Sequence, residues 1–88
     1  MLNEYELEPF KKNEAKIETL KNVYALGSVT AKVIGLLTNR TDNAASMGLY
    51  RYYRQGLLSR ETGDFGKTLE YTLTEKGRAR LEWLTRFD

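Results

Sequence analysis

The stretch GLLSRETGDFGKTLEYTLTEKG, Gly56–Gly77, decides the fold. In its second half Leu69, Tyr71 and Leu73 alternate with polar residues, a period of two that is typical of a strand with one buried face. The segment GDFG at 63–66 is a tight turn between this strand and the segment LLSRET before it. The stretch therefore predicts a β-hairpin.

Three further elements are predicted around the hairpin, each beginning at a threonine that can cap a helix. Thr41 can cap a helix that ends at Gly56, a residue suited to the left-handed turn that follows a helix. Thr30 can cap a shorter helix, and Thr74 a final one whose inward side holds Leu81 and Leu84. The buried stripe of the shorter helix is expected to comprise Val33, Ile34 and Leu37.

A first helix is predicted over 9–26, because Pro9 can open a helix and Gly27 can end one. Apolar residues recur along it at helical spacing. The inward face is expected to carry Phe10, Ile17, Leu20 and Tyr24. Ser28 and Val29, which follow this helix, are expected to form a short bridge-like strand.

Composition excludes several classes of chemistry. The chain has 88 residues, enough for one small domain, and it contains neither Cys nor His. Thiolate or imidazole metal ligands, disulfides and an imidazole general base are therefore ruled out, so we predict no cofactor, no metal site and no enzymatic activity. No apolar run reaches the length of a membrane span, so a cytoplasmic protein without a membrane partner is expected.

Charge is distributed unevenly although the formal net charge is only +2. Residues 1–20 carry five Glu against three Lys, whereas residues 40–60 carry four Arg against one Asp. A local basic face beside an acidic one is the electrostatic pattern of a nucleic-acid-binding protein.

The order of elements resembles the winged helix-turn-helix fold, and four motifs resemble MarR- and PadR-like transcriptional regulators. The motifs are TAKVI from Thr30, NAASM from Asn43, GLL from Gly56 and LTEKG from Leu73. The resemblance implies an α+β fold of helix, short strand, helix, helix, strand, strand and helix, with a three-helix core and a β-hairpin wing. A single domain over 1–88 is expected, with residues 1–8 flexible, a helix-turn-helix over 30–55, a wing over 57–73 and a last helix over 74–87.

The resemblance also implies a sequence-specific double-stranded DNA-binding transcriptional regulator, with the third helix in the major groove. At about 100° per residue, Ala45, Leu49 and Tyr52 fall on the inward face of that helix. The opposite face carries arginine and asparagine, which can pair with guanine and adenine edges, and apolar groups that can contact thymine methyls. The predicted readers are Asn43, Ser46, Met47, Tyr50, Arg51 and Arg54. Tyr53 falls between the two faces, against either the wing or the first helix.

Other residues are expected to contact the DNA backbone. Arg60 and Lys67 on the wing fit phosphate contact or insertion into a narrow minor groove, although Asp64 at the tip opposes this. Phe65 either folds back on the hairpin or contacts a partner. The predicted backbone contacts are Thr30, Lys32, Arg40, Thr41, Arg60 and Lys67.

Association as a homodimer is expected, because a single module of this size covers little DNA. Aromatic and apolar residues near both chain ends are the predicted interface: Tyr5, Leu7, Phe10, Trp83 and Phe87. The alternative is that the two ends pack on each other within one monomer. The sequence neither indicates nor excludes a small-molecule effector.

Two other functions fit the same sequence. A winged helix can serve as a protein-interaction module, with Met47, Tyr50 and Phe65 as protein contacts. A plasmid or viral replication or partition protein would share the DNA-binding mechanism in another biological context.

Overall fold

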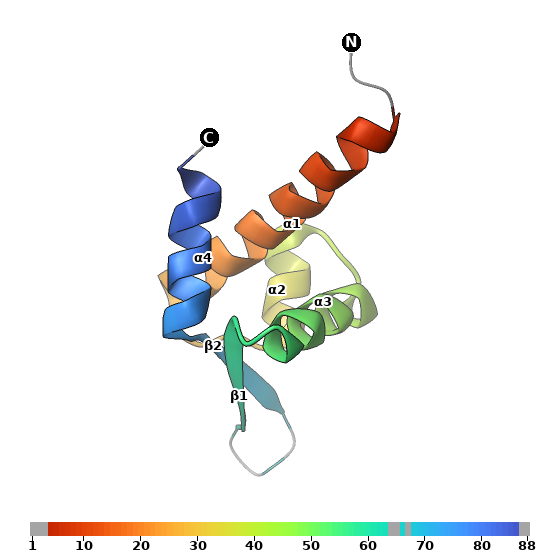
Figure 1. Ribbon diagram of the computed structural model, residues 1–88. Coiled ribbons are helices and arrows are strands. Elements are labelled where there is room, and N and C mark those ends of the chain that lie inside the picture. Colours follow the sequence, from red (N-terminus) through yellow and green to blue (C-terminus); the bar gives the residue numbers. More distant parts are fainter. Residues whose placement is uncertain (1–3, 64–65, 67, 87–88) are drawn as a thin grey trace.

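The computed structural model describes residues 4–63, 66 and 68–86, with backbone but no side chains for residues 4–13. The helices are α1 (Glu4–Leu26), α2 (Ala31–Thr38), α3 (Asp42–Arg54) and α4 (Glu75–Thr85). The strands β1 (Leu58–Thr62) and β2 (Leu69–Leu73) form an antiparallel hairpin between α3 and α4. The start of α1 and the end of α4 lie on one side of the molecule, and the hairpin projects from the other (Figure 1). The predicted winged helix-turn-helix architecture is confirmed.

Threonine caps set the starts of three helices, as predicted. In each case the side-chain oxygen accepts a hydrogen bond from the backbone N–H three residues later, which satisfies a donor that the helix leaves free. The pairs are Thr30 with Val33 at 3.3 Å, Thr41 with Ala44 at 3.1 Å and Thr74 with Gly77 at 3.0 Å. The turn after α3 contains Gly56 with a φ of +80°, which explains why glycine stands there.

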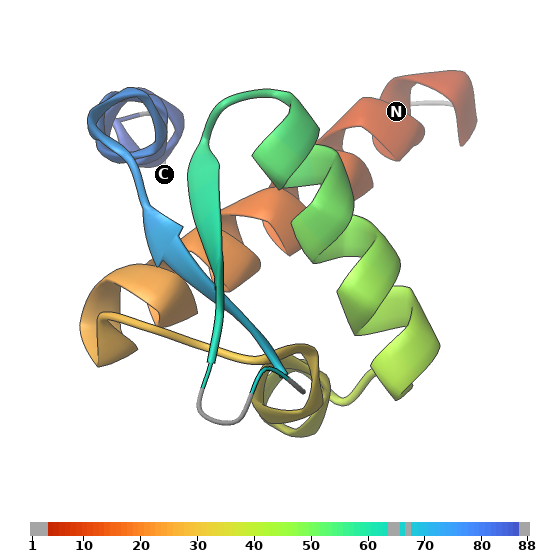
Figure 2. The same ribbon diagram turned by 90° about the horizontal axis from the view of Figure 1, so that it is seen from below.

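The predicted short strand before α2 is present as a single bridge. Val29 donates to the Tyr71 carbonyl at 3.0 Å, and Tyr71 donates back to the Val29 carbonyl at 2.8 Å. Seen from below, the segment between α1 and α2 passes beside the hairpin (Figure 2). The bridge therefore joins the wing to the helix-turn-helix unit.

The surroundings of Gly77 explain why the LTEKG motif ends in glycine. A Cβ atom at this position would lie 1.9 Å from the Leu57 carbonyl oxygen, which no side chain could tolerate. The same carbonyl accepts a hydrogen bond from the Thr74 amide at 3.1 Å. The first turn of α4 therefore packs directly on the backbone at the start of the wing.

A single core lies between the helices and the inner face of the hairpin. Leu20 and Val23 of α1, Leu49 of α3 and Leu58 of β1 are fully or almost fully buried. The other buried apolar residues are Val29, Ile34, Ala45, Tyr52, Leu57, Tyr71, Leu81 and Leu84. The inward positions predicted for α3 and α4 are thus confirmed.

The first helix differs from the prediction in two respects. It begins at Glu4 rather than Pro9, so the helix includes residues 4–8. Tyr24 is 55% exposed, whereas Val23, which was not predicted, is fully buried. Tyr24 lies in the last turn of α1, where its ring packs under the Arg78 guanidinium at the edge of α4 instead of beneath that helix.

The predicted stripe of α2 is wrong at two of its three positions. Ile34 is buried, but Val33 and Leu37 are 37% and 51% exposed. The physical cause is the tight turn into α3, which brings the Arg40 carbonyl to 2.9 Å from a Cβ built on Gly35. Gly35 is buried beside Ile34, and with these two residues on the inward side helical spacing puts Val33 and Leu37 toward the surface.

Candidate nucleic-acid interface

Helix α3, the predicted recognition helix, has the two faces that its sequence predicts. Ala45, Leu49 and Tyr52 are buried, and the opposite side is exposed. Met47 and Tyr50 are 57% and 45% exposed. We call the outward set the groove face: Asn43, Ser46, Met47, Tyr50 and Arg54.

The amino-terminal half of the groove face combines an amide with a thioether. Asn43 and Met47 lie one turn apart, with Nδ2 of Asn43 4.0 Å from Sδ of Met47. This contact is weak, so the Asn43 amide keeps its capacity to bind another group. Ser46 is exposed nearby.

The carboxyl-terminal half is organised around tyrosine rings. Arg54 Nη1 donates a hydrogen bond to Tyr50 Oη at 3.3 Å, and its guanidinium carbon lies 6.0 Å from the Tyr50 ring centroid. The Tyr50 and Tyr53 rings are 6.2 Å apart. Tyr50 and Arg54 are exposed at the end of α3 that adjoins the wing, whereas Tyr53 is half-buried.

Arg60 on β1 completes this group. Its guanidinium carbon lies 4.4 Å from the Tyr53 ring centroid and 5.7 Å from that of Tyr50. A hydrogen bond to Tyr71, its partner across the hairpin, raises the pKa of Arg60. Tyr53 thus lies against the wing, one of the two alternatives left open by the sequence. We call Tyr50, Tyr53, Arg54 and Arg60 the tyrosine–arginine cluster.

The outer face of the wing is acidic. Side chains alternate along a strand, so Arg60 and Tyr71 face α3 while Glu61 and Glu70 face away from it. Glu61 and Glu70 are direct cross-strand partners, and both are exposed. Lys67, Asp64 and Phe65 of the predicted wing tip lie outside the described residues.

The predicted backbone contacts of the helix-turn-helix unit are in three different situations. Lys32 is exposed. Thr30 and Thr41 use their hydroxyl oxygens as helix caps, which leaves their hydroxyl protons as donors. Arg40 turns back to α1, where Nη2 lies 3.8 Å from the Glu18 carboxylate and Nη1 donates to Thr19 at 3.4 Å.

Arg51 is separated from the other predicted readers. It lines a hollow of about 340 Å³ together with Lys16, Tyr52 and Gln55, between α1 and α3. Lys16 donates to Gln55 Oε1 at 3.3 Å and lies 5.6 Å from the Tyr52 ring centroid. Burial, and then repulsion from Arg80 and Arg51, lowers the pKa of Lys16.

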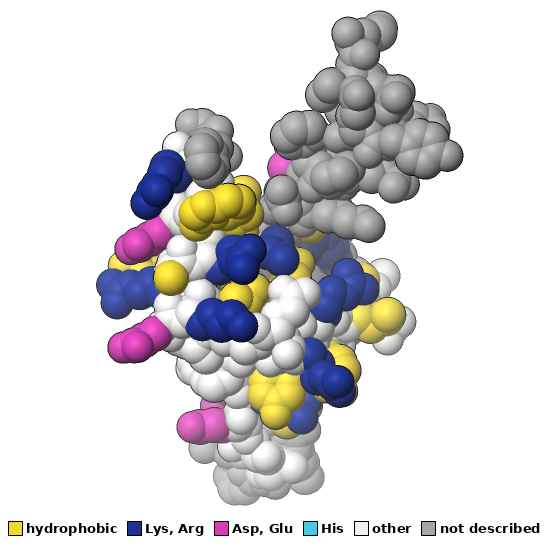
Figure 3. Space-filling view, viewed as in Figure 1, with side chains coloured by type: hydrophobic (Ala, Val, Ile, Leu, Met, Phe, Trp, Pro, Cys, Tyr) yellow, Lys and Arg dark blue, Asp and Glu magenta, His cyan; other side chains and the backbone are white. Residues whose placement is uncertain are grey.

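The basic surface therefore extends beyond α3. Figure 3 shows Lys and Arg side chains gathered over α4, α1 and the carboxyl end of α3, with acidic side chains along one edge of that face. Sequence reasoning missed Lys16, and no local pattern marks it. Its place depends on how α1 crosses α3, which only the packed structure shows.

Most of the residues predicted to form a dimer interface lie outside the described part of the structure. The side chains of Tyr5, Leu7 and Phe10, and the whole of Phe87, lie outside the described residues. Trp83 is 51% exposed, with the Arg80 guanidinium carbon 5.8 Å from its ring centroid.

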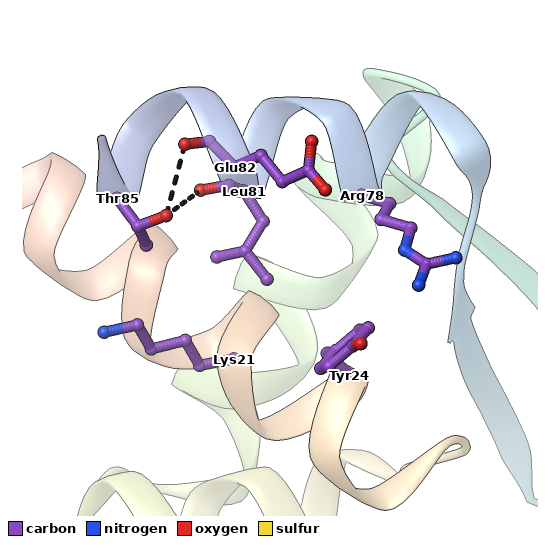
Figure 4. A pocket seen from close by; sticks show the side chains of 6 residues that line it. All are labelled: Lys21, Tyr24, Arg78, Leu81, Glu82 and Thr85. Atoms are coloured by element: carbon purple, nitrogen blue, oxygen red, sulfur yellow. Dashed lines mark hydrogen bonds between the residues drawn. The ribbon is translucent and has the colours of Figure 1, made fainter.

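A second hollow, of about 330 Å³, lies between α1 and α4 (Figure 4). Arg78 packs on the Tyr24 ring at 5.5 Å, and the Thr85 hydroxyl hydrogen-bonds to the Leu81 and Glu82 carbonyls. Within the part of the chain that the structure describes, no group of His, Cys, Asp and Glu is suited to a metal ion. The described helices include none that is long and apolar enough to cross a membrane.

No protein-family model and no curated protein matches this sequence. Solved structures do match it. YusO from Bacillus subtilis aligns with a TM-score of 0.80 and 19% identity over 91% of this chain and 60% of its own. A mutant MarR from E. coli complexed with operator DNA aligns with a TM-score of 0.75 and 18% identity over 82% of this chain and 52% of its own.

A mutant MepR from S. aureus bound to an oligodeoxyribonucleotide has a TM-score of 0.76 and 24% identity, covering 83% of this chain and 55% of its own. The chain thus spans about half to three fifths of the length of these structures. At these identities the likeness concerns the backbone. The chain therefore has the winged helix-turn-helix fold that YusO, MarR and MepR share.

Proposed function

We propose that this chain is a sequence-specific double-stranded DNA-binding transcriptional regulator and not an enzyme. The observation that carries the proposal is the groove face, which displays Asn43, Met47, Tyr50 and Arg54 on an exposed helix beside a wing. Large apolar groups exposed together on one face are typical of a contact surface. Amide and guanidinium groups beside them supply the donors that read base edges.

The mechanism follows from the chemistry of each side chain. With α3 in the major groove, Arg54 can pair with O6 and N7 of a guanine, and Asn43 with N6 and N7 of an adenine. Met47 and Tyr50 supply apolar contacts to thymine methyl groups. Lys32 on α2 and Arg60 on β1 are the proposed phosphate contacts, and such contacts fix the register of a helix on the duplex.

The fold neighbours support this proposal, because the MarR structure is complexed with operator DNA and the MepR structure is bound to an oligodeoxyribonucleotide. We further propose a cytoplasmic protein that binds DNA as a homodimer. One module of this size covers about 600–1,000 Å² of DNA-facing surface, and two-fold pairing on a palindrome doubles that area. Exposed Trp83 on α4 is the described residue that best suits such an interface.

Selection of bound duplexes from a random pool, followed by fluorescence anisotropy at several salt concentrations, tests the proposal. We expect an enriched motif with two-fold symmetry and an affinity that falls steeply as salt rises. Arg54→Ala should weaken binding of the selected duplex by about tenfold and relax the base preference at one base pair. Arg86→Ala, which removes an exposed arginine from the end of α4, is the matched control and should leave that preference intact. Absence of any salt-dependent affinity would rule out DNA binding.

Exposed side chains on α2 favour a second candidate function, a protein-interaction module. Leu36 is 75% exposed and Leu37 51%, on a helix with little polar surface. If α2 is the working surface, Leu36→Ser should abolish partner capture, and the Arg54 variant should behave as wild type in every binding assay.

A further inference from the structure

Tyr53 lies off the groove face, and it still carries the closest cation–ring contact among the described residues. The Arg60 guanidinium carbon is 4.4 Å from its ring centroid. Tyr53 itself is half-buried and packs against the core cluster. Its ring is therefore held by the protein interior, while Arg60 extends from β1 onto it.

Both arginines of the cluster are held by rings and not by carboxylates. Among the side chains that the structure describes, neither Arg54 nor Arg60 forms an ion pair with an acidic group. A carboxylate would neutralise a guanidinium and occupy the N–H edge that a phosphate needs. A ring face holds the flat side of the guanidinium and leaves its charge uncompensated. Arg60 uses part of its N–H edge in the hydrogen bond to Tyr71, and the remaining N–H groups can still donate to a phosphate.

The contact between Tyr53 and Arg60 depends on where each residue lies in α3 and in β1. Tyr53 is the penultimate residue of α3, and Arg60 is paired in the hairpin with buried Tyr71. Tyr71 also bridges to Val29, at the start of the helix-turn-helix unit. The contact between Tyr53 and Arg60 therefore joins α3 to the wing. Tyr53 packs on the core, and Tyr71, which pairs with Arg60, is buried in it.

We infer that Tyr53 is a positioning residue that holds Arg60 ready for a DNA phosphate beside the major groove occupied by α3. The inference rests on the proposed function, since it names how one phosphate contact of that interface is prepared. Holding a long side chain before binding removes part of the entropy cost of ordering it in the complex. Tyr53 thus raises affinity for duplexes of every sequence without touching a base.

A double-mutant cycle tests this. Tyr53→Leu, which keeps bulk but removes the aromatic face, should weaken binding of every duplex by about fivefold, the size of an ordinary cation–ring contact. Tyr53→Phe, which keeps the ring, should bind within about twofold of wild type. In an Arg60→Ala background, Tyr53→Leu should cause no further loss. A full loss in that background, or none in the wild type, overturns the inference.

The matched control is Tyr24→Leu. It removes a ring that carries Arg78 at 5.5 Å between α1 and α4, away from the wing. We expect its DNA affinity to be unchanged, so a general effect of losing a ring–arginine contact would be detected. Circular dichroism and thermal melting of each variant establish that the fold is retained.

A measurement without DNA separates this inference from the proposed function. In NMR spectra of the free protein, the Arg60 side-chain protons over the Tyr53 ring should be shifted upfield. Tyr53→Leu but not Tyr53→Phe should remove most of that shift, because the Tyr50 ring is farther away at 5.7 Å. No shift in the wild type overturns the positioning role even if DNA binds. A shift in a protein that binds no duplex refutes the proposed function, and with it the phosphate contact, while leaving the ring contact established.

Discussion

Arg40 and Arg60 flank the same helix, α3, along the chain, and the sequence predicts both as phosphate contacts. Arg40, in the turn before α3, lies 3.8 Å from the Glu18 carboxylate and donates to Thr19. Arg60, on the strand after α3, lies 4.4 Å from the Tyr53 ring centroid. Both arginines lie a few residues from an end of α3, but one contacts a carboxylate and the other contacts an aromatic ring.

The difference shows that an immobilised arginine is not necessarily an available one. Glu18 offsets part of the charge of Arg40, and the pair joins the turn to α1. Tyr53 holds Arg60 without changing its charge. We therefore expect Arg40 to contribute mainly to stability and Arg60 mainly to DNA affinity, and four predictions test that division.

The largest expected effect is on DNA affinity. Arg60→Ala should weaken binding of every duplex by about tenfold and reduce the slope of log affinity against log salt by about one, since one phosphate contact is lost. Arg40→Ala should change neither by a comparable amount. Anisotropy titrations at four salt concentrations measure both. Equal losses of slope in the two variants would contradict the division.

Next comes stability. Arg40→Ala should lower the free energy of unfolding by about 1 kcal/mol, because a half-exposed ion pair and a hydrogen bond to buried Thr19 are both lost. Urea unfolding followed by circular dichroism gives this value. Arg86→Ala, at the carboxyl end of α4, is the charge-matched control. An Arg40 variant as stable as that control would show that the contact with α1 contributes nothing.

A smaller effect is expected from the acidic face of the wing. Replacing Glu61 and Glu70 by Gln removes two like charges that lie directly opposite, and should stabilise the hairpin by a few tenths of a kcal/mol. It should also raise DNA affinity by about twofold at low salt, and this gain should disappear at high salt. A gain that survives high salt would indicate a direct contact instead of a long-range field.

The smallest effect is expected when Arg40 loses its acidic partner and so resembles Arg60, which has none among the described side chains. Glu18→Gln removes its acidic partner but not its hydrogen bond to Thr19, so DNA affinity should rise by less than about twofold. A double-mutant cycle with Arg40→Ala assigns any gain to Arg40. A gain that persists without Arg40 would instead reflect the lower acidity of α1 as a whole.

Local chemistry made much of the fold predictable. Threonine caps, Gly56 and the alternation in β2 each act over a few residues, so their consequences can be worked out without the rest of the chain. The division of α3 into an inward and an outward face followed from helical spacing alone. These features suffice for the order of elements and for most of the groove face.

Contacts between distant segments were not predictable in this way. The exposure of Val33 and Leu37 depends on how closely the turn at Arg40 approaches Gly35. The pairing of Arg40 with Glu18, and of Arg60 with Tyr53, depends on side chains that only the packed fold brings together. Helical spacing left Tyr53 between two faces because a wheel describes one helix and not its neighbours.

Gly77 has a consequence for how chains of this kind can be sorted. A methyl group there would collide with the Leu57 carbonyl, so any sequence that adopts this crossing must keep a glycine at that point, whatever its task. Finding LTEKG after a hairpin in another genome therefore diagnoses architecture alone. Under the function proposed above, a better criterion for DNA binding is a guanidinium that lies on aromatic rings and has no acidic partner. Arg60 has this arrangement with Tyr50 and Tyr53.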